Sequence, residues 1–192
     1  MISLRKEQGF TLVELLVTMS IFTMLSTSMY LNLRSSTKGI ILNTLTQQIV
    51  TEVRHAQTYS LANVNTTIGA SEFQAYGVYF NITTPNSVIL FTDLNKNTIY
   101  DGGIELINTF TIKNQNKISK ICVNMKADNK NPSNCTSSPN VFINATFTRP
   151  YPEPILSSNL LAAPTDVDII LQTDTGIQKT VVIWVTGQIA VE

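Results

Sequence analysis

One carboxylate stands in an otherwise uncharged apolar stretch near the start of the chain. Between Phe10 and Leu33, Glu14 is the only charged side chain, and the stretch contains neither proline nor glycine. A carboxylate in the hydrocarbon core of a membrane costs a few kcal/mol, so its presence there points to a function. The simplest alternative is a helix-end charge whose side chain reaches the lipid headgroups.

A second group of oxygen-bearing side chains could wrap a hard cation such as calcium. Oxygen ligands at alternate positions suit such a loop, and the residues concerned are Asp93, Asn95, Asn97 and Asp101. The spacing departs from the EF-hand pattern, because Thr98 replaces the tight-turn glycine and Ile104 replaces the bidentate glutamate. We therefore treat calcium as a weak candidate and favour a polar hairpin loop with Asx turns, closed by Gly102-Gly103.

Residues for catalysis are scarce. The chain has no histidine pair for a metal, no nucleophile-elbow pattern around a serine and no glycine-rich phosphate loop. His55, the only histidine, is expected at the surface, and Asp166 and Asp168 are expected to face water at the start of a strand. We predict no enzymatic activity and no cofactor.

The charge composition argues against a further class of protein. The 192 residues carry 13 Lys and Arg against 13 Asp and Glu, and a formal net charge of zero argues against a nucleic-acid binder driven by phosphate contacts. The two cysteines, Cys122 and Cys135, could close a short loop in an oxidising compartment or remain free thiols.

The apolar stretch is long enough to span a bilayer as a helix. Residues 1–9 before it are short and polar, and Arg5 and Lys6 should keep this end in the cytoplasm. We expect a single-pass protein of the inner membrane, with a span over residues 10–33 and its C-terminal domain on the extracytoplasmic side.

A second apolar stripe follows the span at three- and four-residue spacing. Its members are Leu42, Leu45, Ile49, Val53 and Ala56. The pattern predicts one long helix from Phe10 to about Ala62, whose amphipathic part (34–62) lies on a globular domain, although a break near Gly39 would also fit.

Residues 63–192 alternate like β-strands and contain no long helical pattern. Strands are expected at 76–82, 87–92, 104–113, 118–124, 141–148, 167–172, 180–186 and 189–191, with hairpin turns at Thr84-Pro85-Asn86 and Asp174-Thr175-Gly176. The stretch 125–140 is expected to be an exposed loop, and 149–154 an extended surface connection because of its three prolines. The predicted fold is α+β, a long N-terminal helix packed on an antiparallel sheet.

The start of the chain resembles the leader junction of type IV prepilins and type II secretion pseudopilins. The residues that carry this resemblance are Gly9-Phe10-Thr11-Leu12-Val13-Glu14-Leu15, after a short basic leader. The resemblance implies a pilin fold, cleavage between Gly9 and Phe10 by a prepilin peptidase, and methylation of the new amine on Phe10. In this reading Glu14 pairs with the positive amine of a neighbouring subunit, which fixes the register of assembly.

Three looser matches resemble the H-type minor pseudopilins and FimT-like minor pilins: Tyr76-Gly77-Val78-Tyr79-Phe80, Phe91-Thr92-Asp93 through Asp101, and Gly187-Gln188-Ile189. They imply a minor subunit whose partners are other pilin or pseudopilin subunits, in a type II secretion pseudopilus or a type IV pilus. The alternatives are a membrane-anchored periplasmic binding module or enzyme, and a minor pilin for DNA uptake, which the neutral net charge disfavours.

Overall fold

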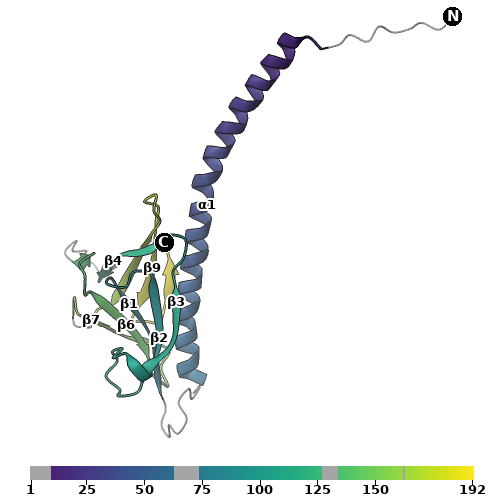
Figure 1. The fold of residues 1–192 in the computed structure, drawn as a ribbon. Coiled ribbons are helices and arrows are strands. Elements are labelled where there is room, and N and C mark those ends of the chain that lie inside the picture. Colours follow the sequence, from purple (N-terminus) through teal and green to yellow (C-terminus); the bar gives the residue numbers. More distant parts are fainter. Residues whose placement is uncertain (1–9, 63–73, 127–133, 162) are drawn as a thin grey trace, which may run out of the picture. The chain divides into compact units, whose positions relative to one another are not determined.

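The protein is described by a computed structural model that covers residues 10–62, 74–126, 134–161 and 163–192, with only the backbone of 31–36. The chain divides into two compact units, 1–39 and 40–192. Helix α1 (Leu12–Ala62) includes residues of both (Figure 1). The fold is α+β, as the sequence predicts.

The second unit, hereafter the globular unit, contains two five-stranded sheets in which every pairing is antiparallel (Figure 1). One sheet has the order β3-β2-β1-β6-β7 and the other β10-β9-β8-β4-β5. A short 3-10 helix, η1 (Gly103–Glu105), precedes β3. The strands are β1 (Ala75–Asn81), β2 (Ser87–Asp93), β3 (Leu106–Thr111), β4 (Lys117–Val123), β5 (Cys135–Thr136), β6 (Phe142–Phe147), β7 (Pro154–Ser158), β8 (Asp166–Gln172), β9 (Gln178–Trp184) and β10 (Ile189–Val191).

The core of the globular unit lies between α1 and the inner faces of both sheets. The predicted helical stripe is buried throughout, with relative exposures of 0 to 6% for Leu42, Leu45, Ile49, Val53 and Ala56. These side chains join one buried cluster with residues of the first sheet, such as Val78, and of the second, such as Ile169. Burial of the stripe explains why this part of α1 is helical, because a short isolated helix is marginal in water.

Both predicted hairpins are present. β1 pairs with β2 and β8 with β9. The first turn is closed by the Ser87 N–H, which donates to the Thr84 carbonyl at 3.1 Å. In the second turn Gly176 has a φ of 89°, a left-handed conformation that glycine adopts without steric cost.

Three strand predictions need correction. The expected strand at 104–113 is shorter, because its first residues form η1 and the strand is confined to Leu106–Thr111. The surface connection expected over 149–154 ends one residue early, because Pro154 is the first residue of β7. Proline is tolerated there because β7 is an edge strand. The expected loop at 125–140 contains the two-residue strand β5, which pairs with β4.

Candidate assembly site and polar clusters

The first turn of α1 is closed by reciprocal hydrogen bonds between Thr11 and Glu14. The Glu14 N–H donates to Thr11 Oγ1 at 3.2 Å, and the Thr11 N–H and hydroxyl donate to Glu14 Oε2 at 3.5 and 3.4 Å. The Thr11 carbonyl accepts from the Leu15 N–H at 3.2 Å, so Thr11 is the N-cap of the helix. This arrangement is a capping box, which provides partners for backbone donors that a helix start leaves unpaired.

The site predicted from the sequence does not include Thr11, because that prediction uses only the charge of Glu14. The signal was present, because Thr-x-x-Glu before an apolar stretch is the sequence signature of a capping box. The carboxylate also lies at the positive end of the helix dipole, which favours it. Glu14 therefore has a local structural role within one chain, in addition to the two roles considered from the sequence.

The geometry around Glu14 leaves part of the carboxylate available to a second group. The Thr11 N–H and hydroxyl both donate to Oε2 of the Glu14 carboxylate. Within the described residues, the other oxygen, Oε1, accepts no hydrogen bond. Phe10, four residues earlier, is 80% exposed. Gly9, on the other side of the predicted cleavage site, lies outside the described residues.

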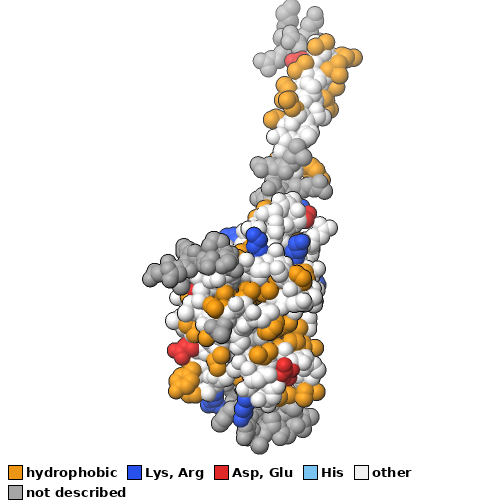
Figure 2. Space-filling model, turned by 90° about the vertical axis from the view of Figure 1, so that its left-hand side faces the viewer, with side chains coloured by type: hydrophobic (Ala, Val, Ile, Leu, Met, Phe, Trp, Pro, Cys, Tyr) orange, Lys and Arg blue, Asp and Glu red, His pale blue; other side chains and the backbone are white. Residues whose placement is uncertain are grey.

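One segment of α1 is long and apolar enough to cross a membrane, judged by length and composition. It comprises Leu12–Tyr30, and none of it is buried. Figure 2 shows hydrophobic side chains along this segment. This candidate span lies within the predicted range of residues 10–33.

Four hydroxyl side chains of the span are hydrogen-bonded within the helix. Thr18, Ser20, Thr23 and Thr27 each donate a hydroxyl to a backbone carbonyl three or four residues earlier, at 2.8 to 3.0 Å. An unpaired hydroxyl in hydrocarbon costs several kcal/mol, and these bonds remove that cost.

The calcium candidate is a hydrogen-bonded loop, residues 94–102, hereafter the strap. Asp93, which precedes it, is 2% exposed and accepts the N–H groups of Asn97 and Thr98 at 3.1 and 2.8 Å. Glu105, which follows it, is 4% exposed and accepts the N–H groups of Leu94 and Asp101 at 3.3 and 2.9 Å. Both buried carboxylates are thus occupied by backbone donors, as in the polar loop that the sequence analysis favoured.

The remaining candidate oxygens also have partners inside the strap. Asp101 Oδ2 accepts the side-chain amides of Asn95 and Asn97, each at 2.7 Å. Among the described residues, no group of three or more His, Cys, Asp or Glu side chains is arranged to hold a metal ion.

The strap lies across the outer face of the first sheet. Its Tyr100 ring packs 5.2 Å from Tyr79 and 5.4 Å from Phe91, measured between ring centroids. The Tyr100 N–H donates to Asn144 Oδ1 at 3.1 Å, and the Thr98 carbonyl accepts the Thr146 hydroxyl at 3.0 Å. The strap therefore covers β1, β2 and β6.

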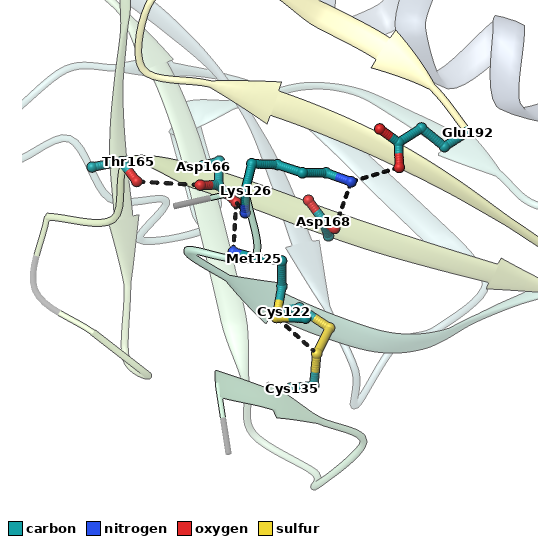
Figure 3. A network of polar contacts seen from close by, with 8 residues as sticks. All are labelled: Cys122, Met125, Lys126, Cys135, Thr165, Asp166, Asp168 and Glu192. Atoms are coloured by element: carbon teal, nitrogen blue, oxygen red, sulfur yellow. Dashed lines mark hydrogen bonds and ion pairs between the residues drawn. A yellow bond between two sulfur atoms is a disulfide. The ribbon is translucent and has the colours of Figure 1, made fainter. Parts of the chain in front are cut away.

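The two cysteines form a disulfide between directly opposite residues of β4 and β5, as Figure 3 shows. Next to it, Asp166 and Asp168 were expected to face water, and this expectation is wrong: they are 1% and 7% exposed. Asp166 Oδ2 accepts the N–H groups of Met125 and Lys126 at 2.7 and 3.1 Å. These bonds hold the segment that follows β4 against the outer face of the second sheet.

Lys126 links this segment to β8 and to the residue that follows β10 (Figure 3). Its Nζ lies 2.5 Å from Glu192 Oε2 and 3.9 Å from Asp168 Oδ2. Asp168 Oδ1 is buried and has no hydrogen-bond partner among the described residues. Burial raises the pKa of Asp168 from 3.8 to about 6; Lys126 opposes the rise, and Asp166 and Glu192 add to it. The hydrogen bond to Glu192 raises the pKa of Lys126.

His55 is half exposed, as expected, and stacks on Tyr59 with ring centroids 6.1 Å apart. Its nearest carboxylate is Glu52, 3.8 Å away and one helical turn earlier. The arrangement is that of a surface pair on a helix.

The comparisons with known proteins concern the N-terminal end, where an acidic, capped helix start precedes a span-length apolar segment. Residues 4–30 match the family model described as the prokaryotic N-terminal methylation motif. This motif indicates a type IV pilin-like substrate of a prepilin peptidase and implies assembly with other pilins. Neither a curated protein nor a solved structure matches the chain.

Proposed function

We propose that this protein is a minor subunit of a type II secretion pseudopilus or a type IV pilus. The single observation that carries the proposal is the methylation motif over residues 4–30, which encloses both the Gly9–Phe10 junction and the capped Glu14. The chain enters the inner membrane through its apolar helix, with the globular unit on the extracytoplasmic side. Prepilin peptidase then cuts after Gly9 and methylates Phe10.

Assembly in this proposal depends on the free side of the Glu14 carboxylate. Cleavage leaves a positive amine on Phe10 at the start of the helix. The Glu14 Oε1 of a neighbouring subunit, which accepts no hydrogen bond from the described residues of its own chain, pairs with that amine. The capping box presents the carboxylate in a fixed orientation, so the pair forms at one axial offset between helices.

The assignment to a minor, H-type subunit rests on the resemblance of the three short segments in the globular unit. The proposal also assigns the protein no catalytic activity, because its contribution is packing. A membrane-anchored enzyme or binding module is the rival from another class, and it requires neither cleavage at Gly9 nor a charge at position 14.

The test is co-expression with a prepilin peptidase followed by mass measurement of the intact protein. The expected product begins at Phe10 and carries one additional methyl group. An inactive peptidase and the variant Gly9→Val serve as controls and should leave the Met1 terminus intact. An uncut protein in the presence of active peptidase, or a cut beyond Tyr30, would overturn the proposal.

A further inference from the structure

One end of the globular unit gathers lysines beside an apolar groove. The groove, of about 390 Å³, lies between the start of the unit's helical part and the end of β3. Ile40, Ile41 and Phe110 contribute apolar surface, and Lys113 lines the groove with them. Ile40 is 63% exposed although it is apolar.

The strand register brings two further lysines to the same end. The turn after β3 is closed by the Asn116 N–H, which donates to the Lys113 carbonyl at 3.3 Å, and β4 begins at the next residue, Lys117. Lys117 is opposite Gln172 in β8, and Lys179 in β9 is opposite the preceding residue, Leu171. Neighbouring strands are about 4.8 Å apart, so the backbones of Lys117 and Lys179 lie on the order of 10 Å from each other at this end of the sheet. Because they are opposite consecutive residues of β8, their side chains leave opposite faces of the sheet and meet only beyond its edge.

These three lysines are little compensated by acids. In the described part of the chain, no ion pair joins Lys113, Lys117 or Lys179 to a carboxylate. Two acidic residues lie near this end: the exposed Asp174 in the β8–β9 turn, and Glu192, whose backbone pairs with Thr180 next to Lys179 and whose carboxylate is bonded to Lys126. Figure 2 shows Lys or Arg side chains here, on the face that it presents.

The opposite end of the globular unit has a different ratio of acidic to basic side chains. Among the described residues of that end, two basic side chains are accompanied by four carboxylates, so the formal charge there is negative. The charged residues of the strap, of its flanks and of the connection into β7 are Asp93, Lys96, Asp101, Glu105, Arg149 and Glu153.

The covalent chain limits how far the lysine-bearing end can be from a bilayer that contains the span. The span ends at Tyr30, and Ile40 is ten residues further along (40 − 30). Ten residues reach at most about 35 Å even when fully extended. A membrane surface is therefore always available to this end at high local concentration, whereas a soluble partner must be recruited.

We propose that the end formed by Ile40, Lys113, Lys117 and Lys179 docks on the headgroups of anionic phospholipids while the subunit waits in the membrane. The inference rests on the membrane insertion of the proposed function. Lysines pair with headgroup phosphates, and exposed Ile40 beside them suits an amphiphilic surface better than a nucleic acid. One lysine close to an anionic membrane changes affinity about fivefold, and the effect is lost at high salt.

The experiment uses the full chain in nanodiscs of phosphatidylcholine alone and of phosphatidylcholine with a quarter phosphatidylglycerol. Lysines are modified by a membrane-impermeant acylating reagent, and the rate at each site is read by mass spectrometry. We expect Lys113, Lys117 and Lys179 to react at least about fivefold more slowly in the anionic discs at low salt. Lys120, on β4 three residues from Lys117, is the internal control and should react equally in both.

A charge-reversal pair completes the test. Lys117→Glu with Lys179→Glu should remove the protection of Lys113, whereas Lys120→Glu should leave it. Equal rates in the two kinds of disc would overturn the proposal, and so would protection by short duplex DNA in neutral discs. The N-terminal mass measurement is independent of lipid composition, so failure here can be distinguished from failure of the filament assignment.

Discussion

At the scale of single residues, Glu14 combines two roles that have different chemical requirements. The capping box needs an acceptor that can reach back to the Thr11 N–H, which glutamine also supplies. Pairing with an amine needs a negative charge, which glutamine lacks. Position 14 therefore allows the helix-capping role and the assembly role to be separated by substitution.

We predict that Glu14→Gln and Glu14→Ala both impair incorporation into filaments, by roughly tenfold or more, because a hydrogen bond to a charged group contributes about 1.5–3 kcal/mol. Thr11→Ala, which keeps the charge but removes the cap, should cost about 1 kcal/mol of local helix stability and affect incorporation less. The measurement is the ratio of filament to membrane subunit, with cleavage checked by mass. Normal incorporation of Glu14→Gln would show that capping alone matters.

Asp168 gives a second residue-scale prediction, for pH dependence. Its pKa is raised from 3.8 to about 6, so the folded protein holds the proton more tightly than the unfolded chain. The protein is then most stable, with respect to this group, below pH 4, and stability decreases as the pH rises from about 4 to 6. Such a shift corresponds to a penalty of up to about 3 kcal/mol that persists at neutral pH.

Asp168→Asn should accordingly raise the free energy of unfolding by about 1–3 kcal/mol at pH 7.5 and change it little at pH 4. Urea denaturation followed by Trp184 fluorescence measures both. Asp166→Asn is the matched control, because Asp166 accepts two backbone N–H groups and its loss should destabilise the protein. A stability gain that is equal at both pH values would contradict the ionisation argument.

At the scale of elements, the strap depends on close packing beneath it. A Cβ atom built on Gly77 in β1 would lie 2.5 Å from Phe91 Cζ and 2.9 Å from Thr146 Oγ1. Phe91 in turn packs against Tyr100 of the strap. The absence of a side chain at position 77 thus allows the ring of Phe91 to lie over β1 and support the strap.

Gly77→Ala should destabilise the globular unit by about 1–3 kcal/mol through overpacking. Gly39→Ala is the matched control, because a Cβ atom there meets no atom within 4 Å and alanine is the better helix former. Chemical denaturation of the two variants gives the comparison. Equal midpoints would mean that Phe91 moves away without cost.

The elements that the sequence predicts well are those whose contacts follow a local period. The stripe from Leu42 to Ala56 and the alternation of Tyr76, Val78 and Phe80 require only the spacing of helix and strand. The strap could not be predicted, because its anchors lie 44 to 59 residues away in the sequence. The same holds for Lys126 and Glu192, which are 66 residues apart.

Asp166 and Asp168 illustrate a different limit. Carboxylates at alternate positions of a strand share one face of the sheet, and two charged side chains predict that this face is exposed to solvent. In the structure the chain after β4 covers that face, and the local pattern contains no sign of this cover. Glu14 shows the opposite case, in which a local signal, Thr-x-x-Glu, was available and its structural meaning was missed.

At the scale of the whole molecule, the division at Gly39 separates a span from a unit with its own core. The buried stripe of α1 belongs to the globular unit. Leu42, Leu45, Ile49 and Val53 each contribute about 1.5–3 kcal/mol by burial. Their sum is comparable to the entire stability of an ordinary domain, about 5–15 kcal/mol.

A fragment of residues 40–192 should therefore fold and unfold cooperatively, whereas a fragment of residues 63–192 should not. Both contain every strand and both cysteines, so the difference isolates the helical stripe. Circular dichroism and thermal unfolding of the two fragments, produced under oxidising conditions, provide the measurement. Cooperative unfolding of the shorter fragment would show that the two sheets form a sufficient core alone.

The internally bonded hydroxyls of the span affect how easily this helix moves from lipid to a contact with other helices. Thr18, Ser20, Thr23 and Thr27 donate to carbonyls of their own helix, so they require nothing from lipid and nothing from a protein neighbour. When this helix moves out of hydrocarbon and packs against other helices, none of these four hydroxyl hydrogen bonds has to break. With respect to these side chains, the two environments are nearly equivalent, which makes the span suited to reversible exchange between them.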